Sequence, residues 1–370
     1  MTAGGMGTDA VRVALVGCGY WGSKHFRVLQ GLEHVSEITV VDSSTRRMNG
    51  LIGAGYRPTR CVSDLSEALP YVDAVVIATP PSTHVPLALE AITEGKHVLV
   101  EKPLALDTVG AQILLHAADQ NNVTLMVGHT FEYNAAVWKL RELVQSGELG
   151  DLYYLDSARL NLGLYQPDVN VIHDLAPHDI SIMNHIMGRR PVAVEAWFSR
   201  HAHARYEDVA SLRIDYGQGV TANIRVSWLD PCKVRRVTVV GSAKMAVYND
   251  LATDERIRIF DKGVHCPETS GDLGQPPMSY RYGDIVAPMI AIEEPLAVQD
   301  GHFIDCVLTG SPPRTDGRSG IDVVQVIECA QIAAAEGRRV LLSELDEDSS
   351  DTAPDVVYLD GALERSALRA

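Results

Sequence analysis

The sequence lacks the features that mark membrane proteins and disulfide-stapled proteins. Its 370 residues contain no run of about 18 apolar residues, so no membrane-spanning helix is predicted. The opening "MTAGGMGTDA" has neither the basic nor the apolar segment of a signal peptide. The six cysteines are scattered without a C-x-x-C pair. We therefore expect free thiols in a reducing cytoplasm, with no disulfide framework and no metal site.

Positive charge is also scarce. The chain has 32 Lys and Arg against 48 Asp and Glu, and its net charge of −16 argues against a nucleic-acid partner. Residues 344–370 hold eight acidic side chains against two arginines. We expect an acidic tail over 346–370 and a disordered N-terminus over 1–10.

The first half of the sequence alternates strand-like and helix-like segments. Its strands are short and nearly continuously apolar, as in "VRVALVG", "YVDAVVIATP" and "KHVLVEKP". Such strands are typical of a parallel sheet covered by helices on both faces. We therefore predict a doubly wound Rossmann domain over residues 11–131.

The second half, residues 132–345, is predicted to form an α/β domain with a mostly antiparallel sheet. Runs such as "LYYLDSARL", "VTANIRVSW" and "KVRRVTVVG" have strand composition and are separated by turn residues. We expect apolar residues on both faces of this sheet, more than the few predicted helices can cover, and hence a homo-oligomer that pairs through it. Residues 265–300 are rich in Pro, Gly and polar residues and are predicted to be an irregular loop.

A glycine motif lies between the first predicted strand and helix. "GCGYWG" places Gly17, Gly19 and Gly22 in the pattern G-x-G-x-x-G. In a dinucleotide site the first glycine permits a tight turn, the second lets the backbone approach the pyrophosphate, and the third lets the helix pack closely. The intervening Cys18, Tyr20 and Trp21 would lie beside the same ligand.

Asp42 ends the next predicted strand, 20 residues after the last glycine. A carboxylate here would bind the adenine ribose hydroxyls and repel a 2′-phosphate, which favours NAD over NADP. Arg46 and Arg47 follow closely, and either could bind that phosphate instead.

Two polar turns follow buried strands later in the first half. In an open parallel sheet, ligands bind beyond the carboxyl ends of the strands. The first turn is Thr79-Pro80-Pro81, with His84 just beyond it, and the second is Glu101-Lys102-Pro103. We expect Lys102 to reach the crevice, because Pro103 ends the strand and restricts the backbone before it.

The stretch "VIHDLAPHDISIMNHIMG" opens a helix in the second half. We expect Asp174 as its N-cap, Pro177 in its first turn and Gly188 at its end. Asp174 and His178 are four residues apart and can share one side of the first turn. The helix terminus and the carboxylate would shift the pKa of His178 in opposite directions, which could hold a general base near neutrality.

Together these motifs resemble the Gfo/Idh/MocA oxidoreductases, the family of glucose–fructose oxidoreductase and inositol dehydrogenase. The resemblance rests on the glycine motif, "ATPPSTH", "EKP" and "DLAPH", and covers about residues 11–345. It implies a Rossmann domain followed by a large open sheet that commonly forms the oligomer interface, in dimers or tetramers.

The resemblance also assigns residue roles. Lys102 matches the family's catalytic lysine, Asp174 and His178 match the pair that binds and deprotonates the substrate hydroxyl, and the Lys102–Pro103 bond is expected to be cis. The cofactor-contacting positions carried over are Thr79, Pro80, Pro81 and His84, and Glu101 and Lys102 are expected beside the cofactor as well.

The expected activity is hydride transfer between NAD, or NADP, and a secondary alcohol or ketone of a sugar or cyclitol. The form of "QPDVNVIHDLAPHD" looks more like members from nucleotide-sugar pathways. Two other interpretations stay open: a redox-neutral enzyme with tightly held NAD, and a non-catalytic dinucleotide sensor.

Overall fold

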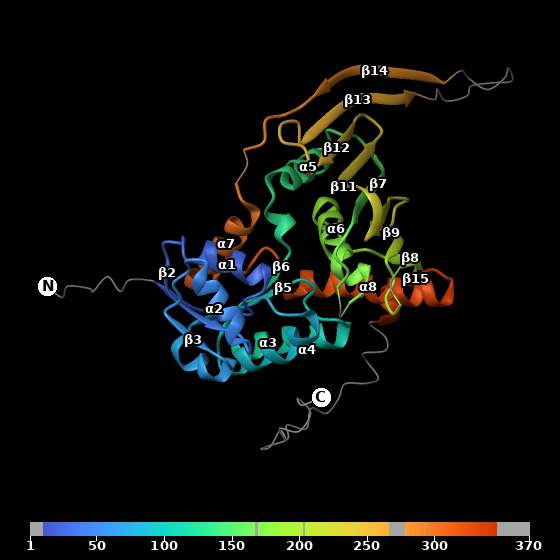
Figure 1. Ribbon diagram of the computed structural model, residues 1–370. Coiled ribbons are helices and arrows are strands. Elements are labelled where there is room, and N and C mark those ends of the chain that lie inside the picture. The colour runs from blue at the N-terminus through green and yellow to red at the C-terminus, as the bar shows by residue number, and fades with distance from the viewer. Residues whose placement is uncertain (1–9, 167–168, 203, 266–277, 292, 346–370) are drawn as a thin grey trace.

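The computed structural model describes residues 10–166, 169–202, 204–265, 278–291 and 293–345. The expected disordered N-terminus and acidic tail lie outside these residues, apart from residue 10. The described part forms two sheets joined by helices, with the first sheet in the lower part of Figure 1 and the second above it. No helix within the described ranges is long and apolar enough to cross a membrane.

The first sheet has six strands in the order β3-β2-β1-β4-β5-β6, and all of its pairs are parallel. This confirms the predicted doubly wound Rossmann fold. Chain order gives β1 (Val11–Val16), β2 (Val35–Val41), β3 (Arg60–Val62), β4 (Ala74–Ile77), β5 (His97–Glu101) and β6 (Leu125–Gly128).

Helices cover both faces of this sheet. Helices α1 (Tyr20–Leu29) and α2 (Thr45–Gly53) pack on one face, and α3 (His84–Thr93) and α4 (Thr108–Asn121) pack on the other. The strands between them are buried on both sides, which explains their continuous apolar sequence.

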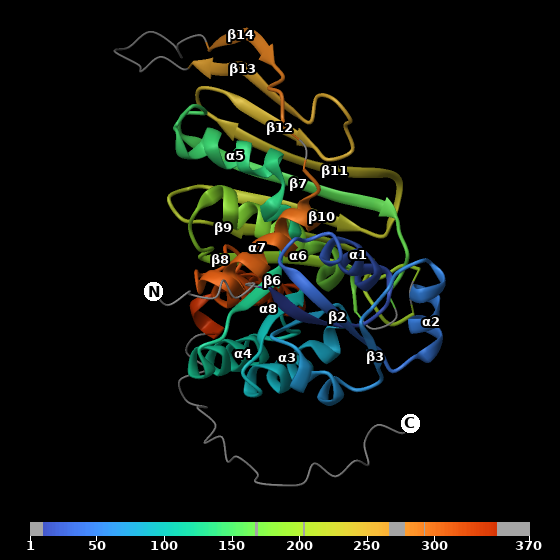
Figure 2. The ribbon, with the colours of Figure 1, turned by 90° about the vertical axis from the view of Figure 1, so that its left-hand side faces the viewer.

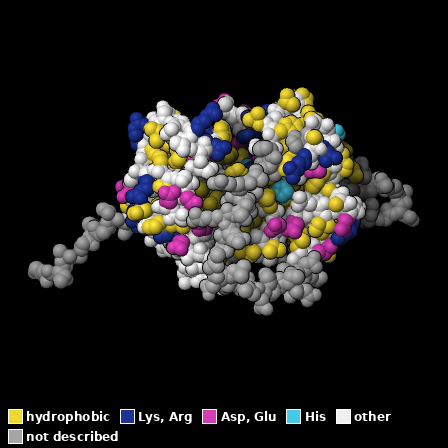
Figure 3. All heavy atoms as spheres, turned by 60° about the horizontal axis from the view of Figure 1, so that its bottom comes forward, with side chains coloured by type: hydrophobic (Ala, Val, Ile, Leu, Met, Phe, Trp, Pro, Cys, Tyr) yellow, Lys and Arg dark blue, Asp and Glu magenta, His cyan; other side chains and the backbone are white. Residues whose placement is uncertain are grey.

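On the face that Figure 3 shows, acidic and basic side chains are interspersed among hydrophobic ones.

Two helices from the far end of the chain complete the first sheet's cores. Phe303 and Ile304 of α7 (Pro295–Thr309) lie in the α1 core, and Val324 of α8 (Gly317–Glu336) lies in the α3–α4 core. Figures 1 and 2 both show α7 beside α1. The predicted division into residues 11–131 and 132–345 stays a prediction, and the chain returns to the first sheet after leaving it.

The second sheet has nine strands and is mostly antiparallel, as predicted, with one parallel pair between β7 and β10. Its order is β14-β13-β12-β11-β7-β10-β9-β8-β15. The bounds are β7 (Leu152–Leu162), β8 (Ala193–Ser199), β9 (Val209–Asp215), β10 (Thr221–Ser227), β11 (Leu229–Gly241), β12 (Met245–Asn249), β13 (Ile257–His265), β14 (Ser279–Val286) and β15 (Val340–Leu341).

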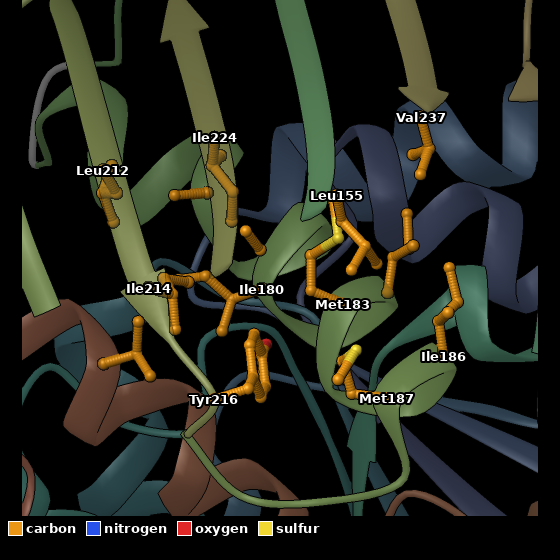
Figure 4. Packing of buried hydrophobic residues seen from close by; sticks show 14 of the residues in the cluster. Leu155, Ile180, Met183, Ile186, Met187, Leu212, Ile214, Tyr216, Ile224 and Val237 are labelled. Carbon is orange, nitrogen blue, oxygen red and sulfur yellow. The ribbon is translucent and has the colours of Figure 1, made fainter. Parts of the chain in front are cut away.

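One face of this sheet packs on α5 (Ala135–Gln145), α6 (Val171–Met187) and α8. Figure 4 shows Ile180 and Met183 of α6 lying beneath Leu212 and Ile224 of the strands. The apolar residues of β10 therefore point to the helices.

The centre of the other face of the sheet carries both charged and aromatic side chains. Asp156 and Arg225 come within 3.9 Å of each other there, and the exposed aromatic side chains Tyr154 and Trp197 lie on the same face. The expectation of apolar residues on both faces is wrong for β10, because the alternation of the strand sends its apolar side chains to the helical side.

Exposed apolar side chains also gather on β13 and β14, at the top of Figure 1. They are Val264, Tyr280, Tyr282, Ile285 and Val286, each more than half exposed. Strand β14 and the start of α7 also correct the prediction of an irregular loop over 265–300, as far as those residues are described.

Candidate active site

The glycine motif forms the turn between β1 and α1, as the pattern predicts. Gly17 has φ +95°, and a Cβ there would lie 2.6 Å from the carbonyl oxygen of Ala78. A Cβ on Gly22 would lie 1.8 Å from the carbonyl oxygen of Gly17, so the helix can approach the strand only with glycine here. A Cβ on Gly19 would meet no atom within 4 Å, which leaves open space for a ligand against its backbone.

The first turn of α1 lies next to this open space. Its N-cap is Gly19, which has no side chain to bond the free N–H groups. Helix N-termini of this kind bind phosphate groups. Tyr20 and Trp21 are 74% and 41% exposed and stand beside the opening. The turn therefore fits a dinucleotide pyrophosphate.

Asp42 lies at the end of β2 and is 6% exposed. Its carboxylate accepts hydrogen bonds from the backbone N–H groups of Cys18 and Ser44, both at 2.8 Å. Burial, followed by the charge of Asp42, raises the pKa of the Cys18 thiol to about 12. Asp42 thus fixes the glycine turn through the bond from Cys18. It also lies at the strand end where the ribose is expected.

The two arginines that follow Asp42 differ in their surroundings. The guanidinium of Arg47 comes within 3.6 Å of the Asp42 carboxylate, and its side chain is 63% exposed. Arg46 is exposed. Arg47 is therefore the arginine placed to meet a group bound at Asp42.

The turns after β4 and β5 are tied together by His84. Its Nδ1 lies 2.8 Å from the carbonyl oxygen of Pro103, and its Nε2 lies 2.9 Å from that of Thr79. The side chain has no exposed surface, and burial lowers its pKa. His84 thus positions both turns and does not offer a free nitrogen to a ligand, whereas Pro80 and Pro81 remain at the surface of their turn.

Glu101, the last residue of β5, is also engaged within the protein. Its Oε1 lies 3.0 Å from Nε2 of His25, and its Oε2 accepts the backbone N–H of Lys102 at 3.1 Å. His25 in turn contacts Asp300 of α7 through Nδ1 at 2.9 Å. Glu101 therefore orients the turn that carries Lys102, and its expected place among cofactor contacts is indirect.

Lys102 leaves the first sheet and meets α6. The Lys102–Pro103 bond is cis, which confirms the expectation. The ammonium donates to the backbone carbonyl of Asp174 at 2.6 Å and lies 3.5 Å from its Oδ1. The side chain of Lys102 is only 10% exposed. The carboxylate and ammonium predicted from separate halves of the sequence are in contact.

The start of α6 differs from the prediction. Asn170 is the N-cap, through a bond from the backbone N–H of His173 to its side chain, and Asp174 lies within the first turn. Pro177 is inside the helix, while Gly188 ends it with φ +63° as predicted. Because Asn170 takes the capping role, the carboxylate of Asp174 is free to bind Lys102 and the indole N–H of Trp228, at 3.0 Å.

His178 lies one turn after Asp174 and packs edge-on against Phe131, with ring centroids 5.2 Å apart. Its Nδ1 is buried without a hydrogen-bond partner among the described residues. Burial, and then the positive charges of Lys102 and Arg159, lower its pKa well below the usual range. The expectation of a pKa held near neutrality is wrong, because the Asp174 carboxylate bonds Lys102 and Trp228 instead of the imidazole.

His129 is a candidate that was not singled out from the sequence. It follows β6 directly, is 1% exposed, and neither ring nitrogen has a partner within the described part of the chain. Burial lowers its pKa. Like Lys102, His129 is a polar side chain at the carboxyl end of a parallel strand, where ligands bind in such sheets.

The chemistry available here is proton transfer beside a fixed positive charge. A neutral imidazole can accept a proton from a hydroxyl group, and the Lys102 ammonium can stabilise an oxygen that gains negative charge. The glycine turn and Asp42 lie at the same edge of the sheet. A dinucleotide and an alcohol could thus meet between β5 and α6.

Comparison with known families gives two matches along the chain. Residues 11–129 match the model of an oxidoreductase family with an NAD-binding Rossmann fold, and residues 137–247 match the GFO/IDH/MocA C-terminal domain.

Several relatives are similar over most of their length. UDP-N-acetylglucosamine 3-dehydrogenase of Acidithiobacillus ferrooxidans is 28% identical over 84% of this chain and 93% of its own. Inositol 2-dehydrogenase of Rhizobium meliloti is 23% identical over 90% of this chain and 99% of its own. Among solved structures, GenD2 from gentamicin A biosynthesis, in complex with NAD, superimposes with a TM-score of 0.74 at 26% identity and covers 92% of this chain and 99% of its own.

Proposed function

Because the chain belongs to the Gfo/Idh/MocA family of oxidoreductases, we propose that it oxidises a secondary alcohol of a nucleotide-activated sugar, or reduces the corresponding ketone. The observation that carries this proposal is the contact of Lys102 with Asp174 beside His178. NAD is the cofactor, and when bound it supplies the hydride acceptor for the oxidation. The similarity to UDP-N-acetylglucosamine 3-dehydrogenase supports the nucleotide-sugar substrate.

In the proposed mechanism, each of three side chains has one task. The neutral imidazole of His178 accepts the hydroxyl proton of the alcohol, and in the reverse direction the imidazolium returns it to the ketone oxygen. The Lys102 ammonium stabilises the developing alkoxide. Asp174 holds Lys102 through its carbonyl and its carboxylate, and Trp228 fixes that carboxylate.

The low pKa of His178 has two consequences for these steps. The imidazole is neutral at physiological pH and ready to accept a proton. Once protonated it is a stronger acid than an ordinary imidazolium, which favours proton return in the direction of reduction, and it is a correspondingly weaker base for the oxidation.

A turnover screen tests the substrate class. Nucleotide sugars, free sugars and inositols are each offered with NAD and with NADP. We expect the highest kcat/KM with a nucleotide sugar and NAD. Turnover of free inositols or free sugars alone would contradict the nucleotide-sugar proposal and leave the oxidoreductase activity intact. NAD retained through purification, with turnover that needs no added cofactor, would favour the redox-neutral alternative instead.

The preference for NAD is expected to rest on Asp42. Replacing Asp42 by Asn keeps the size of the side chain and removes the charge that repels a 2′-phosphate. We expect the ratio of NADP to NAD dissociation constants, measured by fluorescence titration, to fall by about tenfold, the scale of one charged hydrogen bond. Tighter binding of NADP than NAD by the unchanged protein would contradict this assignment and point to Arg47.

We further propose a homodimer or homotetramer in the cytoplasm. The edge strand β14 and its neighbour β13 are the elements best suited to contact a second copy, because an open sheet edge with exposed apolar side chains is otherwise prone to aggregation. Five described cysteines are free, which fits a reducing compartment. A monomer mass by light scattering at micromolar concentration would contradict the oligomer.

A further inference from the structure

A cavity of about 430 Å³ lies along the C-terminal half of α6. Its walls come from α5, α6, the start of α8 and the segments around Glu132 and Arg314. It shares no lining residue with the glycine turn or with the set formed by Lys102, Asp174 and His178. It is therefore a separate site.

Three buried polar atoms in this cavity wall have no hydrogen-bond partner in the part of the chain that the structure describes. They are Oγ of Ser181, Nε2 of His185 and Nε of Arg189. Ser181 is 1% exposed and His185 is 8% exposed. Each unpaired buried group costs about 1–3 kcal/mol, and native proteins contain few of them. Three in residues around one cavity leave hydrogen-bonding capacity that a bound group could satisfy.

The charges of the wall indicate what that group is. Arg141, Arg189 and Arg314 all line the cavity. Arg314 stacks over the ring of Trp138 at 4.2 Å, and Arg141 donates to the backbone carbonyl of His185. These contacts hold the arginines in place without neutralising them.

The two acidic residues of the wall are already paired. Glu132 lies 3.2 Å from Nδ1 of His185, and Asp322 accepts from Arg190, which is not a lining residue, at 2.7 Å. The positive charge of the three arginines is thus in excess. Charge-assisted hydrogen bonds from arginine suit planar or tetrahedral oxyanions.

We propose that this cavity binds a small metabolite through a phosphate or carboxylate group. The oxyanion accepts from Arg189 Nε and from the Ser181 hydroxyl. Phosphate and carboxylate groups are both compact oxyanions. The probe that binds more tightly shows which of the two the cavity prefers.

Isothermal titration of the NAD-saturated protein tests the site. Saturation with NAD occupies the glycine turn, so that inorganic phosphate cannot bind there. Phosphate and citrate are titrated separately at constant ionic strength set with sodium chloride. We expect one binding event per chain with at least one of the two probes, and the stronger probe identifies the class of anion.

Two variants tie that binding to the cavity. Arg189→Gln removes a charge and should weaken binding at least about tenfold. Ser181→Ala removes only a hydroxyl, leaves the fold unstrained and should weaken binding about threefold or more. Arg258→Gln removes a charge from an exposed arginine on β13 that does not line the cavity, and it should bind the probe as the unchanged protein does.

Two results would overturn the proposal. One is the absence of saturable heat with both probes, which would mean that water fills the cavity. The other is an unchanged dissociation constant in both Arg189→Gln and Ser181→Ala, which would place the anion elsewhere. Since the measurement is binding and not turnover, it stands whether or not the proposed oxidation of a sugar is correct.

Discussion

His25 of α1, on the cofactor side of the first sheet, is buried, whereas His178 of α6, on the proposed substrate side, is half-buried, and the two have opposite electrostatic surroundings. Burial alone lowers the pKa of His25, but Asp300 and Glu101 more than offset it and raise the pKa to about 10. His178 faces Lys102 and Arg159, and its pKa is well below the usual range. Burial lowers the pKa of both histidines, and only the two carboxylates beside His25 reverse the direction of the shift.

The opposite pKa shifts of the two histidines correspond to two roles, structural support for His25 and proton transfer for His178. A protonated His25 joins α1, β5 and α7 by bonds to two carboxylates, which leaves no nitrogen for a substrate. A neutral His178 keeps an unpartnered Nδ1 among the described residues and can exchange a proton. The two regions meet at neighbouring positions of one turn, since Glu101 contacts His25 and Lys102 contacts Asp174.

The largest expected effect comes from removing the cation of the substrate side. Lys102→Ala should lower kcat by about 10²–10³, the scale of one preorganised charge stabiliser, and leave the NAD dissociation constant nearly unchanged. Lys102→Arg should also be poor, because a planar guanidinium does not replace a compact ammonium. Steady-state kinetics and a cofactor titration check both. Near-normal turnover in Lys102→Ala would show that this lysine is structural.

The second largest expected effect is on the free energy of unfolding, through the ion pairs of His25 on the cofactor side. His25→Gln leaves Asp300 and Glu101 as buried carboxylates without their cation, so we expect a loss of about 3 kcal/mol in the free energy of unfolding. His178→Gln breaks no ion pair and should cost about 1 kcal/mol or less. Urea unfolding of the two variants compares them directly. Equal losses of stability in the two variants would show that His25 is not held by ion pairs with Asp300 and Glu101.

The pH dependence of turnover sharpens the same contrast. Because the pKa of His178 is lowered well below 6.5, its neutral form persists below that pH, and kcat/KM for alcohol oxidation should stay level as the pH falls past 6.5. Lys102→Met removes one of the charges that lower this pKa, so its residual activity should begin to fall at a higher pH. An acid limb centred at or above about pH 7 in the unchanged enzyme would contradict the assignment of His178 as base.

The last contrast is the pH dependence of stability. A folded-state pKa of about 10 for His25, above its ordinary value of 6.5, means that its stabilisation is fully present below about pH 6.5. It then declines as the pH rises and is lost above about pH 10. The difference in unfolding free energy between the unchanged protein and His25→Gln should therefore shrink from about pH 6 to about pH 10. A constant difference would mean that His25 is neutral in the folded state.

Local sequence was enough to predict the elements whose pattern is repeated within a few residues. The buried strands, the glycine turn and the end of α6 at Gly188 are of this kind. The meeting of Lys102 with Asp174 was implied by the family resemblance, because Asp174 lies on a helix of the second half. The cofactor and the family were also predicted from these motifs.

The missed features depend on residues distant in sequence. Asp300 falls in the segment predicted to be an irregular loop, and only the packing of α7 on α1 brings it to His25. The two faces of the second sheet could not be told apart until the register was known. The pKa of His178 was misjudged because the Asp174 carboxylate turns to Lys102 and Trp228, which no local pattern shows.

The return of α7 to the first sheet has a consequence for biosynthesis. The α1 core is complete only when Phe303 has been made, and the ion pair of His25 only when Asp300 has been made. Between residues 131 and 300 a ribosome working at about 5–20 residues per second needs roughly ten to thirty seconds. Throughout that interval the nascent Rossmann strands carry an apolar surface that α7 has not yet covered. Chaperone capture of the nascent chain is therefore expected to end when α7 leaves the exit tunnel.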